Sequence, residues 1–448
     1  MAVPTSRIAA ELERVGMPAG DLDGRVRLVE SAALEFSRVT GRRPDWAWWI
    51  PGRIELFGKH TDYAGGRSLV AAVPRGFAVV AGPRDDDVIA ARDAHWDADM
   101  QCSLLDDSAV FKGWTNYVAV VGRRLARNFP AARLGTDIVF ASDLPRAAGI
   151  SSSSALVVGV ALALARRGAL VEREEWQAAI RSKLDLAGYL GAVENGLTFG
   201  ALAGTAGVGT HGGSEDHTAI LNAKPECFSA FSYVPVRPLG HARLPDAWCF
   251  AVMSSGVEAS KAGEALDSYN RASLATRALT EVWARHSGQS VQTLAGALAS
   301  ASVSDFERAI ASAPHPDFSA HDLSARLAHF IAEDARVPKA LAAIAGADVA
   351  GLRVLSDGTQ RDADVLLRNQ IPETNALAAL AHDAGAFAAS SFGAGFGGSV
   401  WAMVHADDAA AVVERWQAKY LEQHAPAKPV TAFVARPAPA ASELFLSE

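Results

Sequence analysis

The stretch that decides the fold is Asp143-Leu-Pro-Arg-Ala-Ala-Gly-Ile-Ser-Ser-Ser-Ser-Ala-Leu156. Four consecutive serines, 151–154, precede an apolar run at 155–165 in which Gly159 is the one helix breaker, so we expect a buried helix that begins at the serines. The first amide N–H groups of a helix have no partner within it, and the helix dipole adds positive charge there. The stretch therefore predicts either a phosphate-binding loop, whose hydroxyls can also reach a metal ion, or a capped core helix behind a polar loop.

Composition limits the classes of function. The chain has 448 residues, of which 50% are hydrophobic and 21% charged, so we expect a globular protein of two domains. Its net charge of −8 argues against nucleic acid or an anionic membrane as the main partner. The longest apolar run is too short to span a bilayer, and residues 1–17 do not resemble a signal peptide. Three scattered cysteines fit a reducing compartment, which we expect to be the cytoplasm: Cys102, Cys227 and Cys249.

Hydrophobic periodicity gives a coarse map of the elements. Strands are expected at 46–50, 70–81, 137–141 and 248–253. Helices are expected before Thr40, at 172–193 and through 261–347. Residues 196–213 contain seven glycines and no charge, which indicates a flexible loop or a loop that approaches a ligand. A composition shift near 241–245 places a domain boundary there, giving domains at 1–243 and 244–448.

Two further motifs stand out, one rich in polar residues and the other in glycine. The first, Pro51-Gly-Arg-Ile-Glu-Leu-Phe-Gly-Lys-His-Thr-Asp-Tyr63, presents several hydrogen-bonding groups at one turn, as a polyol site requires; an ordinary capped turn is the alternative. The last, Ser391-Phe-Gly-Ala-Gly-Phe-Gly-Gly-Ser-Val400, lets the backbone approach another group closely or forms a tight turn before a strand. It matches no Walker or dinucleotide fingerprint.

In their order and separation, the three motifs resemble those of the GHMP kinases, and specifically the galactokinases. The first is similar to that family's Pro-Gly-Arg-Val-Asn-Leu-Ile-Gly-Glu-His-Thr-Asp-Tyr signature, the serine loop to its Gly-Leu-Ser-Ser-Ser-Ala loop, and the last to its Gly-Ala-Gly-Phe-Gly-Gly signature. The resemblance runs from about Trp48 to Val404. It implies a two-domain α+β fold with the active site in the cleft between the domains, with ATP and Mg²⁺ bound there. The implied activity is phosphorylation of the anomeric hydroxyl of galactose or a related hexose.

The resemblance also assigns roles by position. Asp216 in Gly213-Ser-Glu-Asp-His217 matches the catalytic aspartate, and Arg53 matches the arginine near the transferred phosphate. Ser153 and Glu194 match the Mg²⁺ ligands. The triphosphate loop comprises Arg146, Gly149, Ile150, Ser151, Ser152, Ser153, Ser154 and Ala155. The sugar site comprises Lys59, His60, Asp62, Gly213 and Tyr269. The glycines of the last motif are Gly393, Gly395, Gly397 and Gly398.

These residue types suit phosphoryl transfer, which needs positioning and charge neutralisation more than covalent help. Mg²⁺ on Ser153 and Glu194 is expected to bridge phosphate oxygens, and Arg53 to stabilise developing charge and keep Asp216 ionised. Asp216 is then placed to accept or orient the proton of the attacking hydroxyl. A surface carboxylate is the alternative reading of Asp216.

The chain departs from the family pattern in four places. Lys59 stands where galactokinases carry a sugar-contacting Glu, which raises the hypothesis that the acceptor is a sugar acid such as galacturonate. The alternative is that Lys59 points to solvent or pairs with Glu55, which itself replaces the usual Asn. The glycine-rich stretch between Glu194 and Asp216 is longer than usual, and Ser154 replaces a common Ala.

A non-catalytic sensor of sugar and ATP is a further candidate function on the same fold. The presence of the whole catalytic set favours an enzyme. The sequence contains no coiled-coil pattern, and we expect a monomer.

Overall fold

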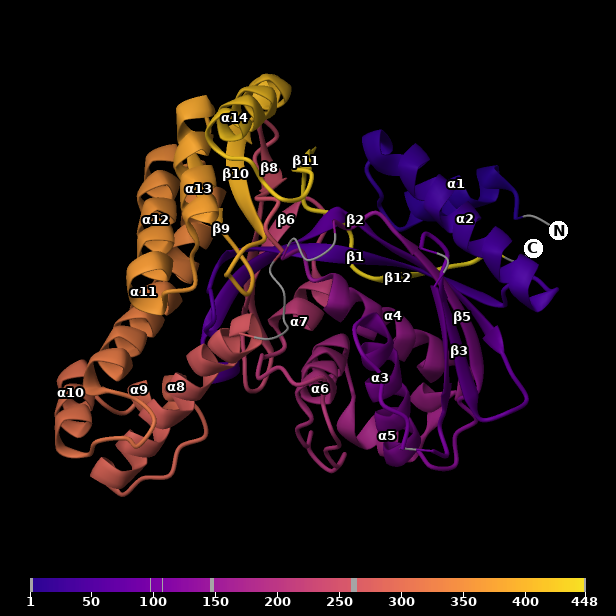
Figure 1. The fold of residues 1–448 in the computed structure, drawn as a ribbon, viewed down its shortest axis with the longest axis horizontal. Coiled ribbons are helices and arrows are strands. Elements are labelled where there is room, and N and C mark those ends of the chain that lie inside the picture. Colours follow the sequence, from indigo (N-terminus) through magenta and orange to yellow (C-terminus); the bar gives the residue numbers. More distant parts are fainter. Residues whose placement is uncertain (1–2, 97, 107, 146–148, 259–263, 447–448) are drawn as a thin grey trace.

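The protein is built on two β-sheets, each covered by helices (Figure 1). The structure is a computed structural model that describes residues 3–446 apart from 97, 107, 146–148 and 259–263. Within those ranges one sheet has eight strands in the order β12-β1-β2-β5-β3-β4, with β6 on β2 and β7 on β6. The other has four strands in the order β11-β8-β10-β9. All pairings are antiparallel except that of β3 with β5.

The centre of the larger sheet is a long antiparallel pair, β1 (Trp46–Phe57) and β2 (Arg67–Pro83). One end of β2 pairs with β5 and the other with β6, so β2 holds the two parts of the sheet together. The remaining strands are β3 (Val88–Asp93), β4 (Ala98–Ser103), β5 (Thr136–Ser142), β6 (Cys227–Ser232), β7 (Arg237–Arg243) and β12 (Ser442–Leu444).

Helices cover both faces of this sheet because its strands are apolar on both sides. The amphipathic α1 (Thr5–Arg14) and α2 (Leu22–Thr40) pack their apolar stripes on one face, against Trp49 and Val80 (Figure 1). The other face carries α3 (Trp114–Asn128), α4 (Ser152–Arg167), α5 (Glu174–Ala179), α6 (Lys183–Asn195) and α7 (Glu215–Asn222).

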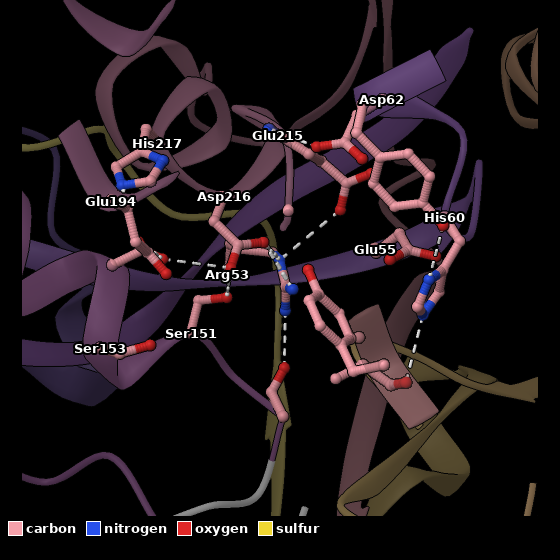
Figure 2. Close-up of a pocket in the computed structure, with 18 of the residues that line it drawn as sticks. Arg53, Glu55, His60, Asp62, Ser151, Ser153, Glu194, Glu215, Asp216 and His217 are labelled. Carbon is pink, nitrogen blue, oxygen red and sulfur yellow. Dashed lines mark hydrogen bonds and ion pairs between the residues drawn. The ribbon is translucent and has the colours of Figure 1, made fainter. Parts of the chain in front are cut away.

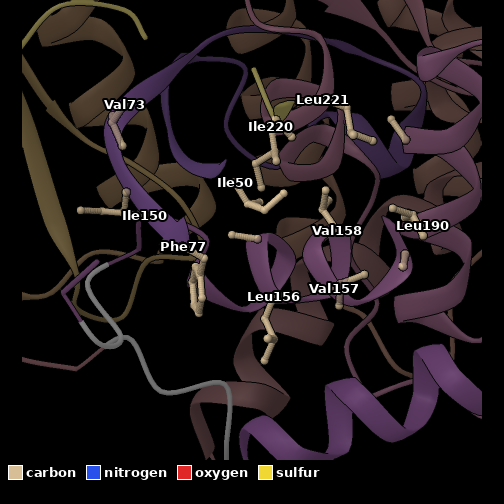
Figure 3. Close-up of a cluster of buried hydrophobic side chains, with 14 of the residues drawn as sticks. Ile50, Val73, Phe77, Ile150, Leu156, Val157, Val158, Leu190, Ile220 and Leu221 are labelled. Atoms are coloured by element: carbon tan, nitrogen blue, oxygen red, sulfur yellow. The ribbon is translucent and has the colours of Figure 1, made fainter. Parts of the chain in front are cut away.

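Helix α4 is buried along almost its whole length, as the apolar run predicts (Figure 3). Its Leu156, Val157 and Val158 belong to the main core cluster, which also contains Ile50 of β1. Gly159 lets the helix lie close to the sheet, since a Cβ atom at that position would be 2.9 Å from Cγ2 of Val79. The start of α4 is therefore fixed against β1 and β2.

The smaller sheet is formed by β8 (Trp248–Ser254), β9 (Ala388–Ser391), β10 (Ser399–His405) and β11 (Ala432–Ala435). Its outer face is covered by α13 (Pro372–Ala384) and α14 (Ala409–Gln423), where the buried Trp416 donates a hydrogen bond to the carbonyl of Leu377. Residues of its other face, among them Phe250 and Trp401, join the main core cluster. The two sheets thus share one core.

Helices connect β8 to β9, and the last of them packs on β9: α8 (Glu264–Ser287), α9 (Leu294–Leu298), α10 (Val303–Ser312), α11 (Ala320–Ala345) and α12 (Val349–Asp362). The first three pack with the start of α11 around a separate apolar cluster that includes Trp283 and Phe306. No helix in the described ranges is long and apolar enough to cross a membrane.

The expected strands and the serine-initiated helix are confirmed, with longer bounds for β1 and β2. The single helix expected over 172–193 is wrong: α5 ends at Ala179 and α6 starts at Lys183, because Ser182 caps α6 by accepting a hydrogen bond from the amide of Asp185 at 3.1 Å. Strand β7 of the larger sheet ends at Arg243, and strand β8 of the smaller sheet begins at Trp248. Strand β12, in the C-terminal part of the chain, nevertheless pairs with β1 of the larger sheet.

Candidate active site

The three motifs meet around one cavity of about 280 Å³ (Figure 2). Its walls come from β1 and the turn after it, the serine loop, α6, α7, α8 and the glycine-rich loop before β10. The lining residues are Arg53, Glu55, His60, Asp62, Tyr63, Tyr117, Gly149, Ser151, Ser152, Ser153, Ser154, Glu194, Asn195, Gly212, Gly213, Glu215, Asp216, His217, Tyr269, Gly393 and Ala394.

The serine loop presents the start of α4 to this cavity. Ser151 precedes the helix with φ of +56°, and its hydroxyl donates to Oδ2 of Asp216 at 2.5 Å instead of capping the helix. The first amide N–H groups of α4 therefore have no side-chain cap and face the cavity wall formed by Ser152 and Ser153. Ile150 and Ala155 belong to the core rather than to the cavity lining. Arg146, a predicted ATP-binding residue, lies outside the described residues.

The glycine-rich loop closes over the serine loop. Gly393 has φ of +78°, and a Cβ atom there would be 3.0 Å from the carbonyl oxygen of Gly149. Gly395 packs still more closely, since a Cβ atom there would be 2.3 Å from the carbonyl oxygen of Asn369. The amide of Gly398 donates to the carbonyl of Val257 at 2.9 Å. Of the four glycines predicted in this motif, Gly393 alone lines the cavity, while Gly395, Gly397 and Gly398 shape the turn with positive φ.

Arg53 and Asp216 form an ion pair at the centre of the cavity (Figure 2). Nε of Arg53 donates to Oδ1 of Asp216 at 2.8 Å, and Nη1 donates to the carbonyl of Gly149 at 2.6 Å. Nε also lies 3.8 Å from Oε1 of Glu215. Burial lowers the pKa of Arg53, but the charges of Asp216 and Glu215 outweigh it and the pKa is raised. The guanidinium thus stays charged and fixes the Asp216 carboxylate beside the serine loop.

Glu194 and Ser153 lie on the same side of the cavity as the serine loop. The Ser154 hydroxyl is within hydrogen-bond distance of both Glu194 (3.1 Å) and Asp216 (3.2 Å). Nε2 of His217 lies 3.2 Å from Oε2 of Glu194, without hydrogen-bonding geometry. One carboxylate and one hydroxyl fit Mg²⁺, which protein sites bind through one or two oxygen ligands together with phosphate oxygens and water.

The opposite side of the cavity presents the His-Thr-Asp-Tyr turn. Nδ1 of His60 shares a hydrogen bond with the Tyr63 hydroxyl at 3.0 Å, and its ring packs on that of Tyr269 with centroids 5.3 Å apart. Oδ2 of Asp62 accepts a hydrogen bond from the amide of Glu215 at 3.0 Å, which fixes the start of α7. Gly213 is required next to it, since a Cβ atom would lie 2.1 Å from Oδ2 of Asp62.

Lys59 does not reach the cavity, although the sequence analysis assigns it to the sugar site. Its side chain is fully buried, and Nζ donates to Ser390 at 2.8 Å and to Thr359 at 3.1 Å. Burial lowers the pKa of Lys59, opposed by the nearby charges of Glu333 and Glu55. Lys59 therefore neither contacts solvent nor lines the cavity. It is not placed to bind the carboxylate of a sugar-acid acceptor.

Two carboxylates that the sequence analysis did not assign line the cavity instead. Glu55 lies two residues after Arg53 on β1, and alternation along a strand places both on one face, which is the signal that would have found it. Burial raises the pKa of Glu55 to about 7, against the charges of Lys59 and Arg53. Burial and the neighbouring Glu55 raise the pKa of Glu215 well above its usual range.

Three family models match parts of the chain. Residues 34–83 match the galactokinase galactose-binding signature, residues 116–195 the GHMP kinases N terminal domain, and residues 342–422 the GHMP kinases C terminal. A galactokinase of Streptomyces coelicolor is 37% identical over 131 residues, which are 29% of this chain and 34% of that protein. A galactokinase of Streptococcus mutans is 35% identical over 124 residues, 27% of this chain and 32% of that protein. The matched segments thus span about a third of these relatives.

Structural likeness extends over nearly the whole chain. The crystal structure of Lactococcus lactis galactokinase complexed with galactose matches with a TM-score of 0.72 at 21% identity, covering 92% of this chain and 98% of that one. Streptococcus pneumoniae phosphomevalonate kinase matches with a TM-score of 0.53 at 14% identity, covering 84% and 97%. At these identities the likeness defines the fold, which is the two-domain α+β fold expected from the sequence.

Proposed function

We propose that this chain, which belongs to the GHMP kinase superfamily and carries its galactokinase signature, is an ATP-dependent sugar kinase. Its expected reaction is transfer of the γ-phosphoryl group to the anomeric hydroxyl of galactose or a related hexose. The observation that carries the proposal is the convergence of the Arg53–Asp216 ion pair, the start of α4 and the His60–Asp62 turn on one cavity.

The triphosphate is expected to lie against the start of α4. There the amide N–H groups and hydroxyls of Ser152 and Ser153 are available to its oxygens, and the helix dipole favours negative charge. Ser153 and Glu194 would hold Mg²⁺, which supplies charge neutralisation when bound. Tyr117 and Asn195 also line the cavity. This half of the site binds and orients the donor.

Asp216 is the group placed to handle the acceptor proton. Its two oxygens are held by Arg53 and by the Ser151 hydroxyl, which fixes the carboxylate between the serine loop and the sugar side. Such a carboxylate accepts or orients the proton of the attacking hydroxyl. Arg53, bound to the Gly149 carbonyl at the edge of the phosphate loop, stabilises charge on the transferred group.

The alternatives raised by the sequence are less favoured. A sugar acid has no cationic partner from Lys59, which lies outside the cavity. Arg53, Asp216 and Glu194 line the same cavity. A sensor that only binds sugar and ATP does not require this set of charged residues, whereas a kinase does. We keep a monomer in the cytoplasm as the expected state. All three cysteines are free thiols.

Release of ADP tests the proposal. The purified protein is mixed with Mg-ATP and galactose, with galacturonate, or without sugar. Release that depends on galactose is expected, and Asp216→Asn is expected to lower it by about 10²- to 10⁴-fold. Asp246→Asn, at an exposed carboxylate paired with Arg243, is the matched control and should retain the rate of the native protein. Equal rates for the native protein and Asp216→Asn would contradict the assignment of Asp216.

A further inference from the structure

The cavity is rich in carboxylates. Among the described residues that line it, five carry carboxyl groups and a single guanidinium, that of Arg53, opposes them. The five are Glu55, Asp62, Glu194, Glu215 and Asp216. Three of these have roles in the account above: Asp216 pairs with Arg53, Glu194 faces the serine loop and Asp62 accepts the amide at the start of α7. Glu55 and Glu215 remain without one.

One carboxylate oxygen of Glu55 accepts no hydrogen bond from the described part of the chain. The residue is 3% exposed, and its Oε1 atom is buried without a hydrogen-bond partner. Its cationic neighbours are Lys59, which donates to Thr359 and Ser390, and Arg53, which donates to Asp216 and Gly149. A buried acceptor that is left unpaired is costly, so this oxygen indicates a donor supplied by a ligand.

Glu215 meets Glu55 inside the same cavity. It is 5% exposed and lines the cavity together with Glu55, and its pKa is raised by burial and by the charge of Glu55. Two adjacent buried carboxylates cannot both ionise without a counter-charge, and Arg53 is already engaged by Asp216 at closer range. A ligand cation bound between them would let both carboxylates ionise.

The kind of donor follows from this charge balance. A carboxylate on the acceptor would be repelled by the pair. A neutral hydroxyl donates one hydrogen bond and leaves the pair short of positive charge, whereas an ammonium group donates three and supplies a full charge. Because Nε of Arg53 contacts both Asp216 (2.8 Å) and Glu215 (3.8 Å), a group bound by Glu215 lies close to the reacting hydroxyl.

We propose that Glu55 and Glu215 bind a protonated amine on the acceptor, so that the substrate class is an amino sugar rather than a neutral hexose. This inference rests on the proposed kinase function and deepens it. Glu55 and Glu215 are then specificity-determining residues, while Asp216 and Arg53 serve the transfer itself.

The test compares acceptors that differ by one charge. ADP release is measured at neutral pH with galactose, 2-amino-2-deoxygalactose, 6-amino-6-deoxygalactose and N-acetylgalactosamine. We expect kcat/KM for one of the two amines to exceed that for galactose by about tenfold or more, the effect of one hydrogen bond to a charged group. In Glu55→Gln that ratio of amine to galactose should fall by about the same factor. Glu281→Gln, at an exposed glutamate on α8, should keep the native ratio.

Calorimetric binding of the same sugars separates failure of this inference from failure of the kinase proposal. Absence of ADP release on every sugar, together with amine binding that Glu55→Gln weakens, would refute the kinase activity and support the amine site. A preference for galactose over both amines, or an amine preference that Glu55→Gln leaves unchanged, would overturn the amine site even if galactose is phosphorylated.

Discussion

At the scale of single residues, Glu55 is a side chain whose charge conflicts with its surroundings. It faces Arg53 on its own strand, Lys59 in the following turn, Glu215 on α7 and Glu333 on α11. Burial nevertheless dominates and raises its pKa from 4.5 to about 7. The two cations around it therefore do not compensate the loss of water, and Glu55 is destabilising when ionised.

This shift predicts a pH dependence of stability. The folded protein holds a proton on Glu55 between pH 4.5 and about 7 that the unfolded chain releases, so the contribution of Glu55 to the free energy of unfolding is lost as pH rises through that window. Glu55→Gln, which imitates the protonated form, should be more stable than the native protein at pH 8 and close to it at pH 5. Urea unfolding at both pH values measures this, and a larger difference at pH 5 would reverse the sign and refute it.

At the scale of elements, the position of the phosphate loop depends on how closely α4 packs on the sheet. Gly159→Ala is expected to lower the free energy of unfolding by about 1–3 kcal/mol, because the new Cβ would be 2.9 Å from the β-branched Val79 on β2. The matched control is Gly24→Ala in α2, where nothing lies within 4 Å of the new Cβ. There we expect a gain of about 0.5 kcal/mol or no change. Equal effects at the two positions, measured by urea unfolding, would contradict this view of α4.

Elements with strong local signals could be predicted from the sequence, and those set by distant contacts could not. The serine run and the apolar residues after it define α4, and the apolar residues 46–50 mark the start of β1. The break between α5 and α6 depends on one cap at Ser182, which hydrophobic periodicity does not register. Most of the predicted site residues meet in one cavity because their motifs border it. The direction of Lys59 depends on residues about 300 positions away, Thr359 and Ser390, and no local pattern indicates it.

At the scale of the whole molecule, Lys59 links the two sheets. It follows β1 of the larger sheet, and its ammonium group binds Thr359 on α12 and Ser390 on β9 of the smaller sheet. Thr359 in turn donates to Glu333 of α11, which also accepts the amide of Gly58 at 2.9 Å. This buried network holds the turn that carries His60 against the second half of the molecule.

Removal of the ammonium group should therefore affect stability more than substrate binding. Lys59→Met is expected to lower the free energy of unfolding by about 3–5 kcal/mol, since it leaves the charge of Glu333 buried with less compensation. Its KM for the sugar should change little in the fraction that remains folded, because the side chain lies outside the cavity. Lys339→Met, at an exposed position of α11, is the control with an expected change below about 0.5 kcal/mol. A raised KM with native stability would return Lys59 to the substrate site.

The central claim is that this cavity transfers the γ-phosphoryl group of ATP to the anomeric hydroxyl of a hexose. ³¹P NMR of the protein incubated with Mg-ATP and the acceptor sugars, galactose and its amino derivatives, tests it most directly, because it reports both loss of the γ-phosphate signal and the position of the new ester. The expected product of the native protein is a sugar 1-phosphate, whose phosphorus is coupled to the anomeric proton. We expect no such product from Asp216→Asn. A phosphate ester at another hydroxyl, or equal product from Asp216→Asn, would contradict it.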